Sequence, residues 1–279
     1  MGTEQRLCRL TVAAAALVLG IFGPPPASAD ELADVKARGS VICATYFAVP
    51  PFGFPDPVTR QPIGFDVDMC SGIARRLGVR MEHKSITVEN RVPELLTGRV
   101  DIVSALLPYT KDRAEVISFS DAVFDYATNV MVLASSDLKT LSELAGKRVS
   151  MTRGTANERY MREKVPTAEI LTYQDASSSF LALQQGKAQG YATITFAGMR
   201  FINETNGKFR FMEESLHKDA CALGLRKGET AFIESVNAAL VEMDKSGEID
   251  ALWTKWLGPE TKYNVPRGRR LTPIAQVTD

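Results

Sequence analysis

The apolar positions of the chain follow two spacings. Runs of apolar and β-branched residues, such as 40–46, fit short buried strands. Stretches with apolar residues at near-helical spacing, such as 65–77, fit helices with one buried face. Glycine ends several of the helical stretches, as Gly78 does after the second one. Strands that alternate with helices in this way predict an α/β fold with mostly parallel sheets flanked by helices.

The same pattern predicts an ordered series of elements. The predicted helices cover 31–38, 65–77, 91–96, 142–146, 156–164, 176–185, 229–245 and 250–257. The predicted strands include 40–46, 79–86, 129–134, 148–152, 170–173, 189–195, 209–213 and 221–225. Prolines exclude the aromatic segment 49–55 from a helix or a central strand. Residues 104–113 are expected to form a polar loop that ends at Arg113.

One short segment recurs in the chain. Residues 95–107 read LLTGRVDIVSALL, and residues 183–196 read LQQGKAQGYATITF. Each copy has a helix end, then a glycine with a basic residue, then an apolar strand. A strand–loop–helix unit also recurs, at 41–77 and 148–164. Repetition of the same order predicts two similar lobes with a cleft between them.

The repeats also predict where the chain crosses between lobes. The crossings are expected near 122–128 and 213–219, because the last third of the chain is unlike either repeat. Two crossings make a two-strand hinge rather than a loose linker. The expected division is a signal peptide at 1–29, lobe 1 at 30–123 plus 218–260, lobe 2 at 124–217 and a C-terminal tail at 261–279.

The first 29 residues have the order of a secretory signal peptide. Arg6 and Arg9 precede the apolar run 10–22, and the small residues 27–29 follow three prolines. The apolar run is shorter than the roughly 20 residues that span a bilayer. We therefore expect export to the periplasm, with cleavage near Ala29.

Charge and histidine content exclude several functions. The chain has 33 Lys plus Arg and 33 Asp plus Glu, whereas nucleic-acid binding needs a basic face. His83 and His217 are the only histidines in the sequence, and neither has a nucleophile motif or metal-ligand spacing. We expect both at the surface. No nucleic acid, catalytic residue, metal or cofactor is expected.

Three cysteines follow the expected signal peptide: Cys43, Cys70 and Cys221. No pair has metal-ligand spacing. The favoured interpretation is three buried residues that act as small hydrophobic side chains. The alternative is one disulfide and one free thiol, because an exported chain meets an oxidising environment.

Four motifs resemble those of one known family. They are GFDVDM at 64–69, YTKDR with FS at 109–120, LAGK with GT at 144–155, and KWLG at 255–258. In this order they are similar to motifs of the polar amino-acid-binding, solute-binding proteins of ABC importers. The resemblance covers nearly the whole chain after residue 29. It implies a periplasmic protein with the two-lobed type II binding-protein fold, an inner-membrane ABC permease as partner, and closure on one small ligand; we also expect a monomer.

The resemblance implies a carboxylate site. Arg113 matches the arginine that pairs with the ligand's carboxylate, because a guanidinium offers two parallel donors to that planar group. Gly154, Thr155 and Ala156 match the place where lobe 2 offers N–H groups at a helix N-terminus. Thr155 also fits a plain N-cap. Leu106 matches a position that contacts ligand through its backbone.

Two positions depart from the family's pattern. Pro108 stands where relatives have a hydroxyl or a backbone donor, and proline has no N–H. Ile194, next to Thr193, stands where many relatives have an aspartate for the ligand's ammonium. An ammonium buried without a partner is costly. Either an acid such as Asp125 or Glu89 substitutes, or the ligand has no ammonium; Thr193 remains a candidate contact.

Four further residues are candidates for the cleft. Tyr46 and Phe52 flank the proline-rich loop, and each fits either a ring that covers the ligand or the core. Asn90 belongs to a loop that faces the cleft in relatives. Arg153 is either a second cation for a diacid or a solvated surface residue.

The sequence therefore favours a periplasmic solute-binding protein. It would capture a small carboxylate-bearing solute, an amino acid or a related organic acid, by hinge closure. One alternative is an enzyme on the same fold, similar to cyclohexadienyl dehydratase, which needs an acid–base pair in the cleft. Ile194 and Pro108 make the cleft poorer in such groups, so no enzyme is expected. The other alternative is the ligand-binding module of a sensor.

Overall fold

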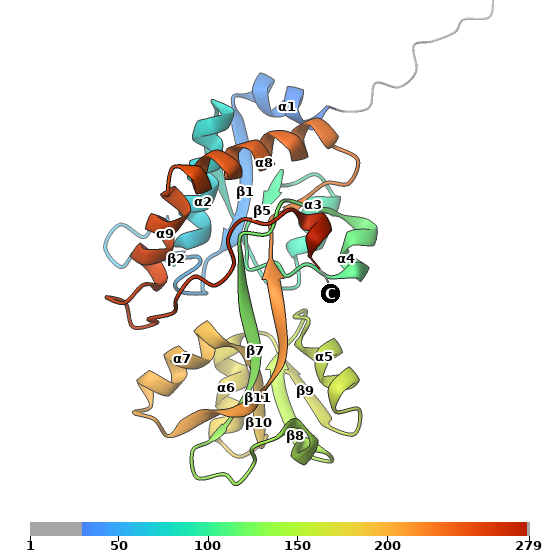
Figure 1. Ribbon diagram of the computed structural model, residues 1–279, viewed down its shortest axis with the longest axis vertical. Helices are drawn as coiled ribbons and strands as arrows, with labels where there is room; N and C mark the ends of the chain where they lie inside the picture. Colours follow the sequence, from blue (N-terminus) through green and yellow to red (C-terminus); the bar gives the residue numbers. More distant parts are fainter. Residues whose placement is uncertain (1–29, 278–279) are drawn as a thin grey trace, which may run out of the picture.

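Two lobes joined by two long strands make up the protein (Figure 1). The computed structural model describes residues 30–277. The expected signal peptide lies outside the described residues. Within 30–277, no helix combines the length and the hydropathy needed to cross a bilayer.

Lobe 1 is built on a five-stranded sheet with the order β4-β1-β5-β12-β6. Its strands are β1 (Ser40–Tyr46), β4 (Arg80–Ile86), β5 (Ile102–Val103), β6 (Ser118–Phe119) and β12 (Gly224–Leu225). Its helices are α1 (Glu31–Arg38), α2 (Phe65–Leu77), α3 (Arg91–Leu96), α4 (Lys111–Val116), α8 (Thr230–Lys245) and α9 (Glu248–Leu257). A small hairpin of β2 (Phe54–Pro55) and β3 (Pro62–Ile63) follows the proline-rich loop.

Lobe 2 has a second five-stranded sheet with the order β11-β7-β10-β8-β9. Its strands are β7 (Phe124–Leu133), β8 (Arg148–Thr152), β9 (Glu169–Tyr173), β10 (Gly190–Ile194) and β11 (Phe209–Cys221). Its helices are α5 (Asn157–Lys164), α6 (Ala176–Gln184) and α7 (Thr195–Glu204), with a 3₁₀ turn, η1 (Leu141–Leu144), before β8. The two-lobed α/β fold is confirmed.

The sheets are mixed rather than mostly parallel. In lobe 1, β1 pairs in parallel with β4 and β5, whereas β12 pairs antiparallel with β5 and β6. In lobe 2, β8 pairs in parallel with β9 and β10, whereas β7 pairs antiparallel with β10 and β11. The antiparallel pairs involve the strands next to the two crossings, because a chain that leaves a lobe and returns reverses its direction.

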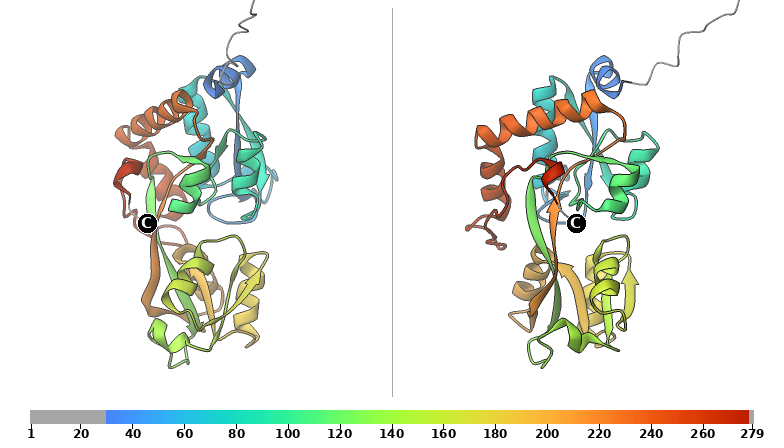
Figure 2. Two further views of the ribbon diagram at one scale, coloured as in Figure 1. Left: turned by 90° about the vertical axis from the view of Figure 1, so that its right-hand side faces the viewer. Right: turned by 45° about the vertical axis from the view of Figure 1, so that its right-hand side comes forward.

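The hinge is the antiparallel pair β7 and β11, which runs from one lobe into the other (Figure 2). The pairing extends from Phe124 opposite Cys221 to Leu133 opposite Phe209, with irregular register around Ser215. β11 thus continues from the predicted strand 209–213 to the start of the predicted strand 221–225, whose end forms β12. Its middle is exposed at Glu213, Glu214 and Ser215, so the apolar pattern is interrupted there although the strand continues.

Two helices lie outside the predicted set. α4 begins inside the expected loop 104–113, where the hydroxyl of Thr110 accepts a hydrogen bond from the N–H of Arg113 at 3.3 Å. Arg113 therefore lies in the first turn of a helix, not at a loop end. α7 follows β10 directly and buries Phe196, Gly198 and Phe201.

The cysteines differ from the favoured prediction. Cys43 of β1 and Cys70 of α2 form a disulfide, with their Cα atoms 6.3 Å apart. Cys221 is a buried free thiol. The interpretation as three buried thiols is wrong because Cys43 and Cys70 face each other where α2 packs on β1; the alternative of one disulfide and one free thiol is confirmed.

The two histidines, expected at the surface, are both partly buried. Nε2 of His83 lies 2.8 Å from Oγ1 of Thr45, and burial lowers the pKa of His83. The ring of His217 stacks on that of Tyr160, with centroids 4.0 Å apart.

The C-terminal tail, residues 259–277, crosses lobe 1 and reaches the hinge strands (Figures 1 and 2). The Arg267 side chain, 6% exposed, donates to carboxylates of Asp244 at 3.0 Å and Asp250 at 2.8 Å. It also donates to the carbonyl of Val123 at 3.1 Å. Beyond it, Thr272 and Ala122 exchange backbone hydrogen bonds. The tail therefore connects α8 and α9 with the start of β7.

Replacing Arg267 with alanine is expected to lower the unfolding free energy by about 2 kcal/mol, because a buried, multiply bonded cation is lost while its acids stay partly solvated. Arg270→Ala is the matched control. Arg270 pairs with the same Asp250, but its side chain is 67% exposed, so its loss should change little. Urea unfolding of both variants measures the difference. Equal midpoints would contradict a stabilising role for Arg267.

Candidate ligand-binding site

A cavity of about 530 Å³ lies between the lobes. Lobe 1 lines it with residues 46–50, 85–91 in part, and Leu106 with Pro108; lobe 2 lines it with parts of 152–157, 174–177 and 191–200. These segments follow the carboxyl ends of the parallel strands β1, β4, β8, β9 and β10, where open α/β sheets place ligands. The volume lies in the ordinary range for small-molecule sites.

The loop after β5 is held in an unusual conformation beside this cavity. Leu106 has φ of +43°, in the left-handed region that leucine rarely adopts. Asp66, in the first turn of α2, fixes the loop by accepting hydrogen bonds from the Ser104 hydroxyl at 3.2 Å and from the backbone N–H of Leu106. Such strain persists where surrounding contacts over-determine the conformation.

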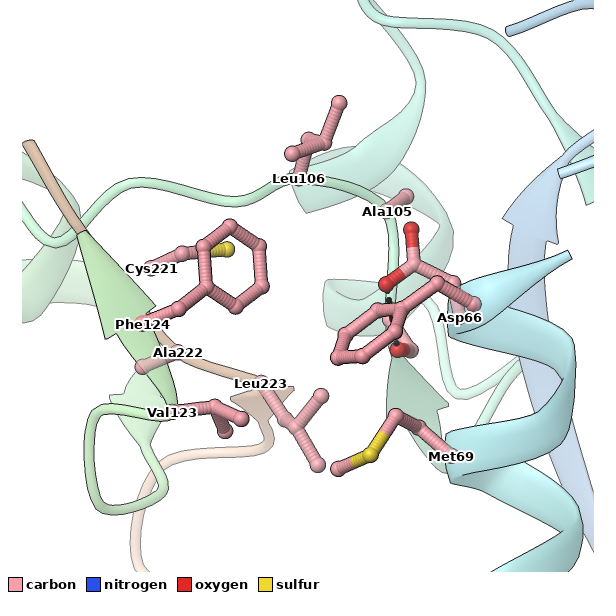
Figure 3. Close-up of a pocket in the computed structure, with 11 residues that line it drawn as sticks. Asp66, Met69, Ala105, Leu106, Val123, Phe124, Cys221, Ala222 and Leu223 are labelled. Carbon is pink, nitrogen blue, oxygen red and sulfur yellow. Dashed lines mark hydrogen bonds between the residues drawn. The ribbon is translucent and has the colours of Figure 1, made fainter. Parts of the chain in front are cut away.

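Asp66 is almost fully buried, at 3% exposure. Figure 3 shows its carboxylate at the start of α2, next to Ala105 and across a small space from Phe124 and Leu223. That space is only about 10 Å³ and is mostly apolar. Burial raises the pKa of Asp66 to about 7, against the hydrogen bonds and the charge of Arg91 that lower it.

The Asp66 carboxyl should make stability depend on pH. Its folded-state pKa is near 7 and its ordinary value is 3.8, so the folded protein holds the proton more tightly than the unfolded chain does. This contribution is complete below pH 4 and is lost as pH rises through 7, by roughly 4 kcal/mol. The Asp66→Asn variant lacks this pH-dependent contribution. Denaturant unfolding at pH 4.5, 6 and 8 should therefore show that wild type loses stability relative to the variant as pH rises. A difference that is constant with pH would contradict this.

Arg91 joins both lobes from the first turn of α3. It is 3% exposed and donates only to backbone carbonyls: Nε to Val88 at 3.0 Å, Nη1 to Ala105 at 3.2 Å and Leu106 at 2.8 Å. Its Nη2 donates to Gly154 of lobe 2 at 3.2 Å. The guanidinium thus holds the loop after β5, which Asp66 also holds, and ties it to the turn after β8.

Arg113 lies next to the cavity lining rather than in it. Its Nη1 donates to the carbonyl of Pro108, which lines the cavity, at 3.1 Å. Burial, and then the positive charge of Arg91, lower its pKa to about 10, while the nearby rings of Tyr126 and Tyr46 act in the opposite direction. Two guanidiniums therefore lie close together where their hydrogen-bond acceptors are neutral carbonyls.

The lobe 2 turn meets the loop before α3. Gly154 has φ of +75°, and a Cβ there would lie 3.1 Å from Cγ of Glu89. Arg153 pairs with Glu89 across the lobes, Nε to Oε1 at 3.6 Å. Neither Arg153 nor Gly154 belongs to the cavity lining. Glycine is required at 154 because of both the positive φ and the close approach.

Thr155 and Ala156 do line the cavity. The Thr155 hydroxyl donates to the carbonyl of Thr152 at 2.7 Å, and α5 starts at Asn157 with Ala156 at the N-cap position. The interpretation of Thr155 as an N-cap is therefore wrong, since the helix begins one residue later than predicted. No capping side chain accepts a hydrogen bond from the first-turn N–H groups of α5.

The remaining candidates fall into two groups. Tyr46, Asn90 and Thr193 line the cavity, with the Arg91 guanidinium 5.9 Å from the centroid of the Tyr46 ring. Phe52 does not: it is fully buried in the core, stacked on Phe124 at 5.9 Å. The structure therefore places Phe52 in the core and not at the cavity, because its ring packs among Phe65, Phe124 and Phe196.

Several lining residues were not predicted from the sequence: Arg91, Tyr126, Asp175, Tyr191 and Arg200. Arg91 reads as an ordinary polar residue at a helix start, and nothing in its local sequence signals burial. Arg200 lies on α7, a helix outside the predicted set. Of these five residues, only Tyr126 could have been expected at the cavity, because it lies in the predicted crossing between the lobes.

The fold, the two-strand hinge and the cavity between the lobes define a two-lobed ligand-binding protein. The chain belongs to the bacterial extracellular solute-binding proteins, family 3, whose family model matches residues 41–259. It is 26% identical over 233 residues to the ABC transporter glutamine-binding protein GlnH of Bacillus subtilis (strain 168), covering 82% of this chain and 85% of that protein. It is 27% identical over 257 residues to the L-cystine-binding protein TcyJ of Escherichia coli (strain K12), covering 91% and 96%.

Solved structures of amino-acid-binding proteins share the fold of this chain. A mutant of the arginine-binding protein ArgBP from T. maritima has a TM-score of 0.74 and 30% identity, covering 81% of this chain and 98% of that one. The ancestral amino acid-binding protein AncCDT-1, described as a precursor of cyclohexadienyl dehydratase, has a TM-score of 0.74 and 26% identity, covering 82% and 100%. The curated relatives are named as binding proteins, not as enzymes.

Proposed function

We propose that this chain captures a small carboxylate-bearing solute in the periplasm and delivers it, as a monomer, to an inner-membrane ABC permease. The observation that carries the proposal is the pair Arg91 and Arg113 beside one cavity between the lobes. Paired guanidiniums with only neutral acceptors favour an anion. The names of the relatives, which bind glutamine and cystine and belong in part to ABC transporters, support a transport role.

Binding proceeds by closure of the hinge. The ligand's carboxylate first meets lobe 1, at the loop 105–108 and Arg113. Lobe 2 then closes with its turn at 154–156, where Arg91 and Glu89 already contact Gly154 and Arg153. Closure excludes water and so strengthens the charged hydrogen bonds. The permease recognises the closed arrangement of the lobes.

A thermal-shift screen against amino acids and organic acids tests this proposal. A true ligand at a hundredfold excess over its Kd should stabilise the protein by about 3 kcal/mol. Native mass spectrometry of the purified protein adds the mass of any ligand that co-purifies and the oligomeric state. If no carboxylate raises the melting temperature and none co-purifies, the proposed function is wrong.

A further inference from the structure

The cavity has cationic side chains on both lobes. Arg91 and Arg113 of lobe 1 donate to backbone carbonyls. Arg200 of α7 lines the cavity from lobe 2, and its side chain is 18% exposed. Within residues 30–277, its Nε forms an ion pair with Oε1 of Glu204 at 3.7 Å, and the Glu204 side chain is 52% exposed to solvent. Each lobe therefore presents positive charge to the cavity.

The acids of the lining are already engaged. Among the described residues that line the cavity, two are acids, Glu94 and Asp175. Glu94 pairs with Lys84 at 2.7 Å and Arg99 at 2.9 Å, and these contacts lower its pKa to about 2. Asp175 is the N-cap of α6, where it accepts from the N–H of Ser178 at 2.8 Å and from its hydroxyl at 3.0 Å.

Acids on adjoining segments also have partners. Asp219 of β11 accepts from the Thr128 hydroxyl at 2.9 Å and from the Tyr160 hydroxyl. Asp125 pairs with Arg269 of the tail, and Glu89 pairs with Arg153. Two acids that the sequence suggested as substitutes for an ammonium partner, Asp125 and Glu89, are therefore committed to other cations.

The lobe 2 wall of the cavity offers no carboxylate at the end of β10. Thr193, Ile194 and Ala197 line it there. Ile194 holds the N-cap position of α7, and no side chain caps that helix. An apolar N-cap leaves first-turn N–H donors without a side-chain acceptor, which is unfavourable for a cation and favourable for an anion.

We infer that the ligand is an organic anion without an ammonium group. Arg91 and Arg113 bind its carboxylate, and the rest of the ligand faces Ile194 and Arg200 of lobe 2. This inference rests on the proposed function and narrows its ligand class from carboxylates in general to acids that lack an amine. An ammonium enclosed beside Ile194 would face guanidiniums, whereas the two lining acids already have partners: Glu94 pairs with two cations, and Asp175 accepts hydrogen bonds at the start of α6.

Matched ligand pairs test the inference by isothermal titration calorimetry on the mature protein. The pairs are glutarate and L-glutamate, succinate and L-aspartate, and 3-phenylpropionate and L-phenylalanine, which differ only in the α-amine. Within the pair that binds, the acid without the amine should bind at least tenfold more tightly. Tighter binding of the amino acid overturns this inference and leaves the proposed function standing. Failure of every carboxylate, including those of the wider thermal screen, overturns the proposed function instead.

Ile194→Asp provides the second arm, with Ile194→Asn as the matched neutral control. Aspartate restores a carboxylate at the N-cap, so it should shift the preference within a pair toward the amino acid by at least tenfold, whereas asparagine should not. Thermal melts identify whether each variant folds. If Ile194→Asp folds and weakens both members of the pair equally, residue 194 does not discriminate the amine and the inference is overturned; if it does not fold, the wild-type pairs decide alone.

Discussion

Replacing Arg113 with methionine is expected to cost about 2–5 kcal/mol of carboxylate binding, as for a buried charge pair left half-made. The ligand-free protein should be at least as stable as before. Burial and the neighbouring Arg91 lower the pKa of Arg113 to about 10, so the charged guanidinium is unfavourable in the folded protein until an anion arrives. Removing it is expected to raise the unfolding free energy at neutral pH, by at most about 3 kcal/mol.

Arg153→Met is the matched control for this variant. Arg153 is also an arginine of the cleft region, but its side chain is 57% exposed and pairs with Glu89. Its loss should change affinity little. Calorimetric titration and denaturant unfolding of both variants give the two quantities. Full affinity in Arg113→Met would place the carboxylate elsewhere, and a large loss of apo stability would show that Arg113 is structural.

Loss of the disulfide should have the second large effect. Replacing both Cys43 and Cys70 with alanine is expected to lower the unfolding free energy by about 3.5 kcal/mol, the chain-entropy value for a loop of this length. The two residues are 27 apart in sequence and join β1 to α2. Both elements carry residues that position the site, Tyr46 and Asp66, so ligand affinity should fall as well.

Cys221→Ala and a reducing agent complete this experiment. Cys221 is a free thiol, so its replacement should leave the response to reductant unchanged. Dithiothreitol should lower the urea midpoint of wild type and Cys221→Ala, but not that of the double variant. Equal midpoints with and without reductant in wild type would show that the disulfide does not contribute to stability.

Much of the fold follows from local pattern. α1, β1, α2, α3 and β8 have the boundaries that apolar periodicity and terminal glycines predict. The pattern fails where tertiary contacts decide. β11 stays a strand through exposed, charged residues because β7 pairs with it, and α4 forms within a polar loop because Thr110 caps it.

The site is less predictable for a similar reason. The cavity is lined by four residues that were predicted from family motifs: Leu106, Pro108, Thr155 and Ala156. A motif can predict such positions because it fixes where the backbone lies. Arg91 was missed because its role depends on four carbonyls from three other segments. The ring of Phe52 was misplaced because a sequence does not tell on which side of a proline-rich loop a side chain lies.

The tail has a mechanical consequence for lobe motion. It is bonded to Ala122, to the carbonyl of Val123 and to Asp125, while β10 begins to pair with β7 at Thr128. Between these parts lie Tyr126 and Ala127 of β7, and the carbonyl of Ala127 accepts a hydrogen bond from the hydroxyl of Thr195 in lobe 2 at 3.2 Å. We therefore expect the rotation axis to pass through this two-residue interval. Tyr126 also lines the cavity. A ligand that contacts this ring would therefore touch the chain at the expected rotation axis of the two lobes.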